Sequence, residues 1–133
     1  MPRDVGSPDI LTLSGLLAER AAHVPDADAL IFPDTRYTYG ELYERARFWA
    51  KAFVGLGVRP KDHVGLLLHT CPEFVEAMFG AALAGAVVAP INARYVGGEL
   101  RYVTENADLA TIVTTGAIAD AVNFVERLND AFP

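Results

Sequence analysis

The chain has 133 residues, 52% of them hydrophobic, and carries a formal net charge of −6 at pH 7. This length suffices for one domain with a real core, but it is short for a complete α/β enzyme. The acidic balance excludes a basic nucleic-acid surface, and the single cysteine, Cys71, excludes an internal disulfide and a multi-cysteine metal site.

The sequence predicts neither a signal peptide nor a membrane span. Residues 1–4 contain no basic region followed by an apolar core. The longest uncharged run, residues 77–93, is interrupted by Gly80, Gly85 and Pro90, which favours a buried helix, a turn and a strand. Together with the single cysteine, these features favour a cytoplasmic protein.

The first third of the chain predicts a flexible arm, a helix and a hairpin. Residues 1–10 form the arm, and Thr12 can cap a helix that runs to about His23. A proline follows, which ends the helix. Residues 29–32 and 36–38 then predict two strands that pair across a turn.

The next element is a long amphipathic helix with a strong start signal. Thr38 and Glu41 have the spacing of a capping box, and Glu41 can pair with Arg45 on the solvent side. Gly57 is expected to end the helix in a left-handed conformation. The apolar face consists of Leu42, Ala46, Trp49, Ala50 and Phe53.

Residues 63–115 predict the core, a parallel β-α-β-α-β unit. Three short apolar runs, at 64–68, 87–91 and 109–114, alternate with helical patterns. Such runs are typical of parallel strands with helices on both faces, so the fold class is a three-layer α/β unit.

The helices of this unit are less regular. The first begins at Pro72, with Thr70 or Cys71 as its cap, and only Glu73 and Glu76 give it a polar face. Small residues, Gly80 among them, are expected to let it approach the sheet. The second helix has Leu100, Val103 and Ala107 on its apolar side, and a further helix is expected over Ala121, Val122, Phe124, Val125 and Leu128.

No phosphate-binding loop is evident. Gly80 and Gly85 have the spacing of a P-loop pair, but no lysine follows and both lie in a helical pattern. No G-x-G-x-x-G follows a strand, so a self-contained dinucleotide site is not expected. Gly97 and Gly98 could line a helix start, although a plain loop is the simpler interpretation.

Histidines and the cysteine give no catalytic constellation. His23, His63 and His69 lie on different elements, so we predict no metal site. His69 ends a core strand, where α/β sheets place ligands, but a histidine bonded to nearby backbone is favoured. Cys71 at a helix start could have a lowered pKa, but a packing role is favoured.

Asn92 and Arg94 follow the end of the second core strand. An arginine at this position can hold a phosphate or carboxylate through two parallel hydrogen bonds. A solvated turn residue is the alternative. From the residues alone, the chain is an α/β domain without assigned catalytic residues.

Several stretches, in this order, resemble the N-terminal region of the adenylate-forming superfamily, which includes acyl-CoA synthetases, aryl-CoA ligases, adenylation domains and luciferases. The Pro-Ile-Asn-x-Arg stretch ending at Arg94 is most similar to the CoA-ligase branch. The resemblance covers nearly the whole chain from Leu11. The stretches are 37–42 (YTYGEL), 45–52, 57–64 (GVRPKDHV), 71–74 (CPEF), 85–94 (GAVVAPINAR) and 99–102 (ELRY).

The resemblance implies a carboxylate–CoA ligase, as in fatty acid metabolism. Such enzymes use ATP and Mg²⁺ to convert a carboxylic acid to an acyl-adenylate, and then transfer the acyl group to coenzyme A. It also implies that Arg94 approaches the CoA nucleotide. The sequence departs from the family at Cys71, where Ser or Asn is commoner, at Lys61, where Gly is commoner, and at residues 96–98, where a Thr or Ser cap is commoner.

Much of the family's machinery is not in this sequence. The phosphate loop ending in Lys-Gly, the aromatic-Gly-x-Thr-Glu segment, the ribose-binding aspartate and the small mobile domain with its lysine are absent. We therefore expect residues 11–133 to be the N-terminal part of a truncated large domain. This part would be inactive alone, would self-associate or be poorly stable, and would need the missing C-terminal part of the same protein. The alternatives are a short non-enzymatic association module and a small stand-alone nucleotide-binding domain.

Overall fold

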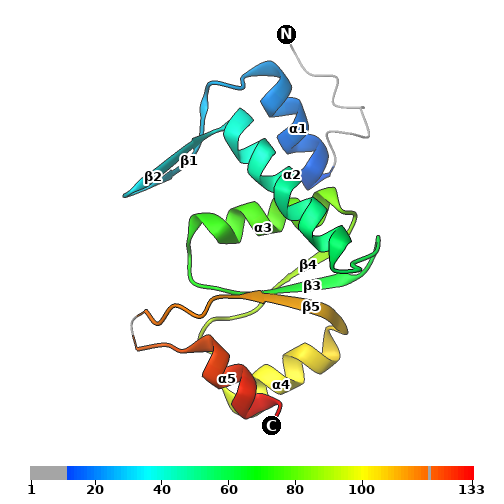
Figure 1. Ribbon diagram of the computed structural model, residues 1–133, viewed down its shortest axis with the longest axis vertical. Coiled ribbons are helices and arrows are strands. Elements are labelled where there is room, and N and C mark those ends of the chain that lie inside the picture. The colour runs from blue at the N-terminus through cyan, green and yellow to red at the C-terminus, as the bar shows by residue number, and fades with distance from the viewer. Residues whose placement is uncertain (1–11, 120) are drawn as a thin grey trace.

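The computed structural model describes residues 12–119 and 121–133 (Figure 1). The arm predicted over residues 1–10 lies outside this part. The helices are α1 (Leu13–His23), α2 (Tyr39–Gly55), α3 (Pro72–Leu83), α4 (Gly97–Asn106) and α5 (Phe124–Ala131). The strands are β1 (Asp28–Phe32), β2 (Thr35–Thr38), β3 (His63–Leu67), β4 (Val87–Pro90) and β5 (Leu109–Thr114).

A three-stranded parallel sheet in the order β4-β3-β5 forms the middle layer. Helices α2 and α3 lie on one side of this sheet, and α4 and α5 lie on the other (Figure 1). The predicted three-layer α/β unit is therefore confirmed. The central strand β3 has neighbours on both sides, and its residues from Val64 to Leu67 are buried, which explains its nearly continuous apolar sequence.

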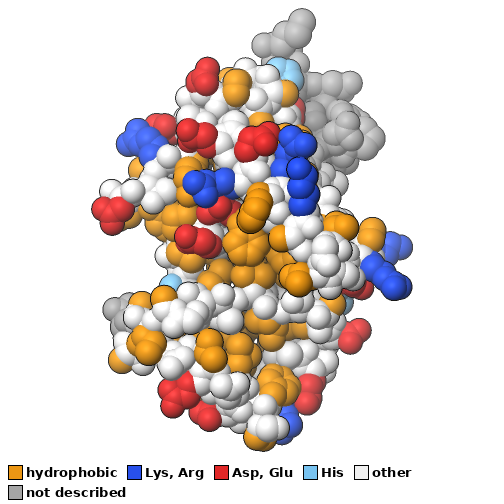
Figure 2. All heavy atoms as spheres, in the orientation of Figure 1, with side chains coloured by type: hydrophobic (Ala, Val, Ile, Leu, Met, Phe, Trp, Pro, Cys, Tyr) orange, Lys and Arg blue, Asp and Glu red, His pale blue; other side chains and the backbone are white. Residues whose placement is uncertain are grey.

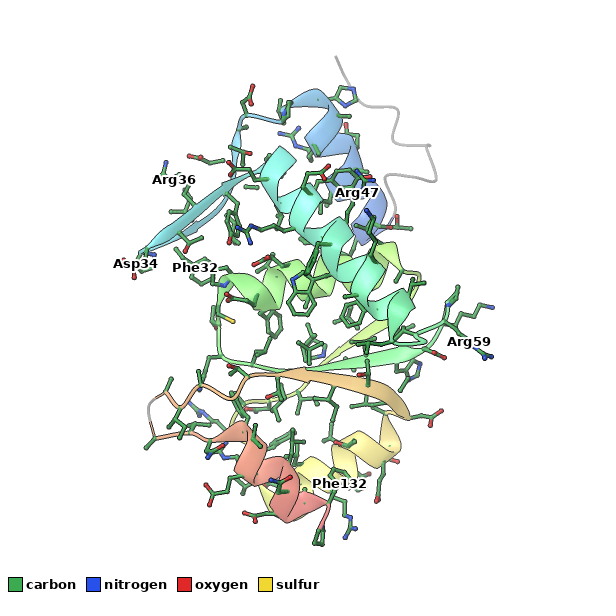
Figure 3. All side chains as sticks on the ribbon, in the orientation of Figure 1. Phe32, Asp34, Arg36, Arg47, Arg59 and Phe132 are labelled. Carbon is green, nitrogen blue, oxygen red and sulfur yellow. The ribbon has the colours of Figure 1, made fainter. Side chains whose placement is uncertain are left out.

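The β1–β2 hairpin forms a separate antiparallel sheet that projects from the body (Figure 1). Arg36 on β2 donates to the Asp28 carboxylate on β1 at 2.8 Å, which ties the two strands together. Figure 3 shows Asp34 at the tip of the hairpin, away from the three-stranded sheet. The hairpin pairs as predicted, and its strands begin one residue earlier than the sequence indicated.

Apolar side chains form one core on each side of the sheet and a third under α1. Phe53 and Leu66 belong to the core between the sheet and helices α2 and α3, whereas Leu100 and Phe124 belong to the core between the sheet and helices α4 and α5. The third core contains Leu17, Leu42 and Ala46. Each fully buried large side chain, such as Phe53, stabilises the fold by about 2–3 kcal/mol relative to its exposed form.

Helix α2 begins and ends as the sequence predicted. The Thr38 hydroxyl accepts the Glu41 N–H at 3.2 Å, and the Glu41 carboxylate accepts the Thr38 N–H at 2.9 Å, which completes a capping box. Gly57 follows the helix with φ of 90°, the left-handed conformation expected after a helix.

Helix α3 differs from the prediction in two ways. Glu76, expected on a polar face, is buried with 4% of its surface exposed, because it faces Arg45 of α2. Gly80 permits a close approach to α2 rather than to the sheet, since a Cβ there would lie 2.3 Å from the Cβ of Trp49. Cys71 is the N-cap residue, but its side chain makes no capping hydrogen bond.

The last helix begins later than predicted. Ala121 has φ of 60° and Val122 forms an isolated bridge with Ala119, so neither residue is helical. Asn123 caps α5 by accepting the Glu126 N–H at 3.1 Å. The apolar pattern alone placed the start too early because Ala121 and Val122 match the helical spacing without adopting it.

Pro90 is accommodated in β4 because its nitrogen points away from β3. The N–H groups of Val87 and Ile91 donate to the carbonyls of Asp62 and Leu66, at 2.8 and 2.9 Å. Alternate residues of a strand direct their backbone groups to opposite sides, so the nitrogen of Pro90 faces the free edge of the sheet, where a proline removes no ladder bond.

Candidate functional site

The carboxyl ends of the three parallel strands meet at one edge of the sheet. Leu66 of β3 aligns with Pro90 of β4 and Val113 of β5, so the residues that follow each strand lie at a similar level. His69 follows β3, and Asn92 and Arg94 follow β4. Ligands of open α/β sheets bind at this edge, so we define these residues and the loops that hold them as the candidate site.

The turn after β4 presents Arg94 to solvent. The Asn92 side-chain oxygen accepts the Arg94 N–H at 2.9 Å, and the Asn92 carbonyl accepts the Tyr95 N–H at 3.0 Å. Asn92 thus organises the turn with both its side chain and its backbone. Arg94 is exposed, and its guanidinium makes no ion pair with any residue that the structure describes. Its charge is available to an anionic ligand.

Helix α5 contacts this turn through a hydrogen bond from Arg127. The Arg127 guanidinium donates to the carbonyl of Ala93 at 2.7 Å in a partly buried hydrogen bond. Phe124, which is completely buried, lies against the His69 ring with centroids 4.7 Å apart. The sequence analysis did not single out Arg127, because nothing local indicates a contact across 34 positions.

His69 differs from the sequence-based expectation, whereas Cys71 has the packing role that the sequence favoured. The Nε2 atom of His69 is buried and has no hydrogen-bond partner among the described residues, so the bonding to nearby backbone that the sequence favoured does not satisfy this atom. Cys71 is half-buried, and its burial raises the pKa of the thiol above its ordinary value. The lowered pKa considered for a helix start is therefore wrong, and packing is the role the structure supports.

The other candidate residues do not converge on this edge. The His23 ring donates from Nδ1 to the Glu19 carbonyl at 2.9 Å at the end of α1, while the ring of His63, at the opposite end of β3, donates to the Ala107 carbonyl. In the described residues, no group of three or more His, Cys, Asp or Glu side chains could hold a metal ion. The side chains in this part of the chain therefore do not fit a Mg²⁺ site.

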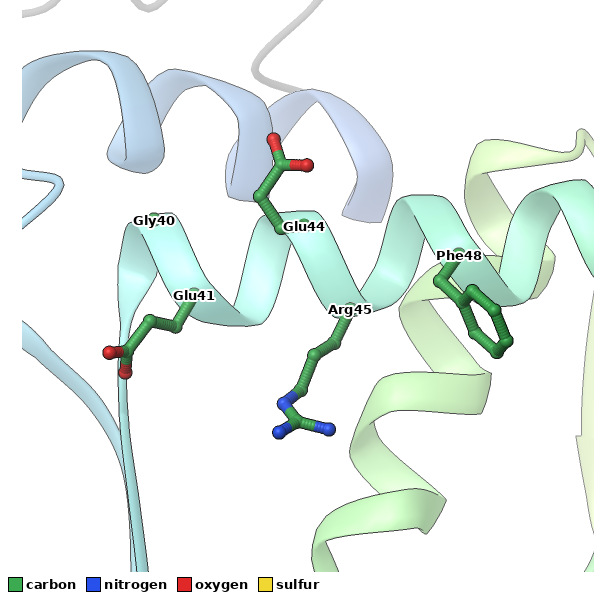
Figure 4. Close-up of a pocket in the computed structure, with 5 residues that line it drawn as sticks. All are labelled: Gly40, Glu41, Glu44, Arg45 and Phe48. Atoms are coloured by element: carbon green, nitrogen blue, oxygen red, sulfur yellow. The ribbon is translucent and has the colours of Figure 1, made fainter.

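A shallow hollow of about 450 Å³ lies on α2, lined by Gly40, Glu41, Glu44, Arg45 and Phe48 (Figure 4). Its charges already have partners. Arg45 faces the Tyr37 ring at 4.5 Å and pairs with Glu76, while Glu41 completes the capping box. Burial, with a smaller contribution from Glu76, raises the pKa of Tyr37. The charged side chains around this hollow therefore serve the fold, and we do not assign a ligand to it.

A second hollow, of about 440 Å³, adjoins the turn that carries Arg94. It is lined by Tyr95, Gly98, Glu99, Tyr102 and Val103. Gly97, with φ of 47°, opens α4 beside it, as a plain loop-to-helix junction. The edge thus offers an exposed cation and a hollow with two aromatic side chains, which together suit binding of a phosphate-bearing group. No catalytic acid, base or nucleophile is assigned to the candidate site.

Comparisons with a family model and with curated proteins point to the same enzyme family. The family described as AMP-binding enzyme matches residues 17–133. The chain is 42% identical over 107 residues to a medium/long-chain-fatty-acid–CoA/3-oxocholest-4-en-26-oate–CoA ligase of Mycolicibacterium smegmatis, covering 80% of this chain and 19% of that protein. It is 38% identical over 95 residues to a crotonobetaine/carnitine–CoA ligase of Salmonella paratyphi B, covering 68% and 18%.

Solved structures agree with these relatives. The N-terminal domain of FACL13 from Mycobacterium tuberculosis superimposes with a TM-score of 0.75 at 30% identity, over 77% of this chain and 26% of that chain. A benzoate CoA ligase from Burkholderia xenovorans gives 0.79 at 26% identity, over 90% and 23%.

The chain spans about a fifth of the length of the curated relatives. None of the described helices has the length and apolar character needed to cross a membrane. The predicted membership of the adenylate-forming superfamily is confirmed by the matched range and by the ligases among its relatives. The chain belongs to the AMP-binding enzyme family, and its fold is that of the N-terminal domain of these enzymes.

Proposed function

We propose that residues 11–133 are the N-terminal part of the large domain of a carboxylate–CoA ligase. The parent enzyme would form an acyl-adenylate from ATP and a carboxylic acid with Mg²⁺, and then an acyl-CoA thioester. The observation that carries this proposal is the 42% identity over 107 residues to a relative named as a CoA ligase. The single cysteine favours the cytoplasm as its compartment.

Within this enzyme, Arg94 would contact a phosphate of the CoA nucleotide. Its exposure, its place at the carboxyl edge of the sheet and its lack of an ion-pair partner among the described residues support this role. A guanidinium suits a phosphate because its N–H groups match two phosphate oxygens at once.

The 133 residues alone would not adenylate an acid. Adenylation requires positive charges around the α-phosphate, and the described residues provide neither a phosphate loop nor a metal site. Three exposed apolar side chains, Phe48 and Val54 on α2 and Leu56 at its C-cap, would instead pack against the remaining domain, or against a second copy when that domain is missing.

The first experiment measures the intact mass of the protein in its own cells. A species several times longer than this chain should release pyrophosphate in the presence of ATP and a matching acid, and should form a CoA thioester. In that species, Arg94→Ala should raise the KM for CoA about tenfold, as expected for one charge-assisted contact. Arg59→Ala, an exposed arginine before the amino end of β3, is the matched control.

The alternative is a short module that acts by association. A native species that ends at Pro133 and releases no pyrophosphate would support this alternative and contradict the ligase proposal. Equal KM values for CoA in the wild-type protein and the Arg94→Ala variant would contradict the role of Arg94 alone.

A further inference from the structure

We infer that Arg127 is a positioning residue that fixes the turn at residues 92–95, so that Arg94 is held ready for a phosphate-bearing ligand. This inference rests on the proposed contact between Arg94 and CoA. Arg127 reaches the turn from a different element, α5, through the 2.7 Å bond to the Ala93 carbonyl.

The turn depends on this outside contact. Asn92 accepts the N–H groups of Arg94 and Tyr95, and these two bonds close the turn locally. Neither bond involves the carbonyl of Ala93. Arg127 occupies this carbonyl with a charged donor, and a charge-assisted hydrogen bond in a partly buried position is stronger than a neutral bond in water. The peptide that leads into Arg94 is therefore tied to α5.

Helix α5 is a firm support for this bond. Phe124 and Ala131, at its two ends, are buried in the same core as Leu100 and Ile91. The Asn123 side chain caps its first turn at 3.1 Å. Ile91 immediately precedes the turn. The same core therefore anchors both the helix that carries Arg127 and the chain that leads into the turn.

A fixed turn lowers the cost of binding. A long arginine side chain on a mobile turn loses backbone as well as side-chain freedom when it binds an anion. With the backbone already fixed, only the side chain of Arg94 needs to be ordered. Loss of the Arg127 contact should therefore weaken CoA binding and leave acid activation unchanged.

Hydrogen exchange tests the contact without reference to activity. In the longest form of the protein that its cells make, Arg127→Ala should speed amide exchange of the peptide covering residues 91–97 at least tenfold. Arg127→Lys, which keeps a charged donor, should give a smaller increase. Arg101→Ala on α4, which also removes an arginine near α5, should leave this peptide unchanged. Thermal unfolding of each variant shows whether the fold is intact. If the alanine variant does not fold, hydrogen exchange in the lysine variant provides the test.

Kinetics of the same variants test the consequence. Arg127→Ala should raise the KM for CoA about fivefold, with the KM for ATP and the rate of pyrophosphate release unchanged. Unchanged exchange in both Arg127 variants would overturn the inference, as would a raised KM for CoA in Arg94→Ala but not in Arg127→Ala. Faster exchange together with an unchanged KM for CoA in Arg94→Ala would instead overturn the proposed CoA contact.

Discussion

The carboxylate of Glu76 lies 3.5 Å from the guanidinium of Arg45, and the two side chains differ sharply in exposure, at 5% and 53%. The second carboxylate oxygen of Glu76 is buried without a hydrogen-bond partner among the described residues. Arg45 also covers the ring of Tyr37 from β2. One arginine on α2 therefore compensates a buried charge on α3 and contacts the hairpin.

Replacing Arg45 by Met should lower the free energy of unfolding by about 1–2 kcal/mol, because the buried carboxylate loses its cationic partner. The expected cost is below that of a fully buried pair, since Arg45 is half exposed. Urea denaturation followed by fluorescence of Trp49, the single tryptophan, measures the change. Arg47→Met, which breaks the exposed pair with Glu44, is the control and should cost less than about 0.5 kcal/mol. Equal costs for both substitutions would show that the burial of Glu76 does not matter.

Gly80→Ala should destabilise the protein by about 1–3 kcal/mol, because the added methyl group overlaps α2. Its Cβ would lie 2.3 Å from the Cβ of Trp49 and 3.0 Å from the Ala46 carbonyl oxygen. Gly55→Ala is the matched control, since it lies in α2 with no atom within 4 Å of the added group. This control should raise stability by up to about 1 kcal/mol through helix propensity. A neutral Gly80→Ala would mean that α2 and α3 are packed less closely than described.

Thr38→Ala should cost about 1 kcal/mol, because the N–H of Glu41 loses its acceptor at the start of α2. Thr38→Ser keeps the hydroxyl and should retain most of the stability. Thermal unfolding monitored by circular dichroism at 222 nm measures both variants. If the serine variant were as unstable as the alanine variant, the methyl group of Thr38 rather than its hydroxyl would be responsible.

The reaction of Cys71 with iodoacetamide should require a higher pH in the folded chain than in 8 M urea. Only the thiolate reacts, and burial raises the folded pKa of Cys71. Because the folded pKa lies above the unfolded one, the thiol's contribution to stability is complete below the unfolded pKa and is lost as pH rises through the folded pKa. Alkylation rates from pH 7 to 11 give both midpoints. A midpoint in the folded chain at or below that in urea would contradict the raised pKa.

Features encoded within a few residues were predictable from the sequence. The capping box needs only Thr38 and Glu41, and the end of α2 needs only Gly57, so the sequence specifies both. The alternation of apolar runs and helical patterns likewise identified the β3, β4 and β5 strands, because buried parallel strands require continuous apolar sequence.

Features that depend on distant partners were not predictable. Glu76 looked solvent-exposed because its partner, Arg45, lies 31 positions earlier on another helix. The neighbour of Gly80 was misassigned for the same reason, since the spacing of small residues does not say which element they face. In the candidate site, Arg94 was identified from its place after a strand, whereas Arg127 was missed because its contact exists only after folding.

The outward-facing nitrogen of Pro90 makes the two edges of the sheet, strands β4 and β5, unequal as templates for pairing with a further strand. At the β4 side, an added strand would meet a position without a donor, so it would lose a hydrogen bond there. At the β5 side, all six residues from Leu109 to Thr114 have an N–H group. Growth of the sheet, by a strand of the proposed larger enzyme or by an unwanted second chain, is therefore favoured next to β5. A single proline thus gives the sheet a preferred direction of growth.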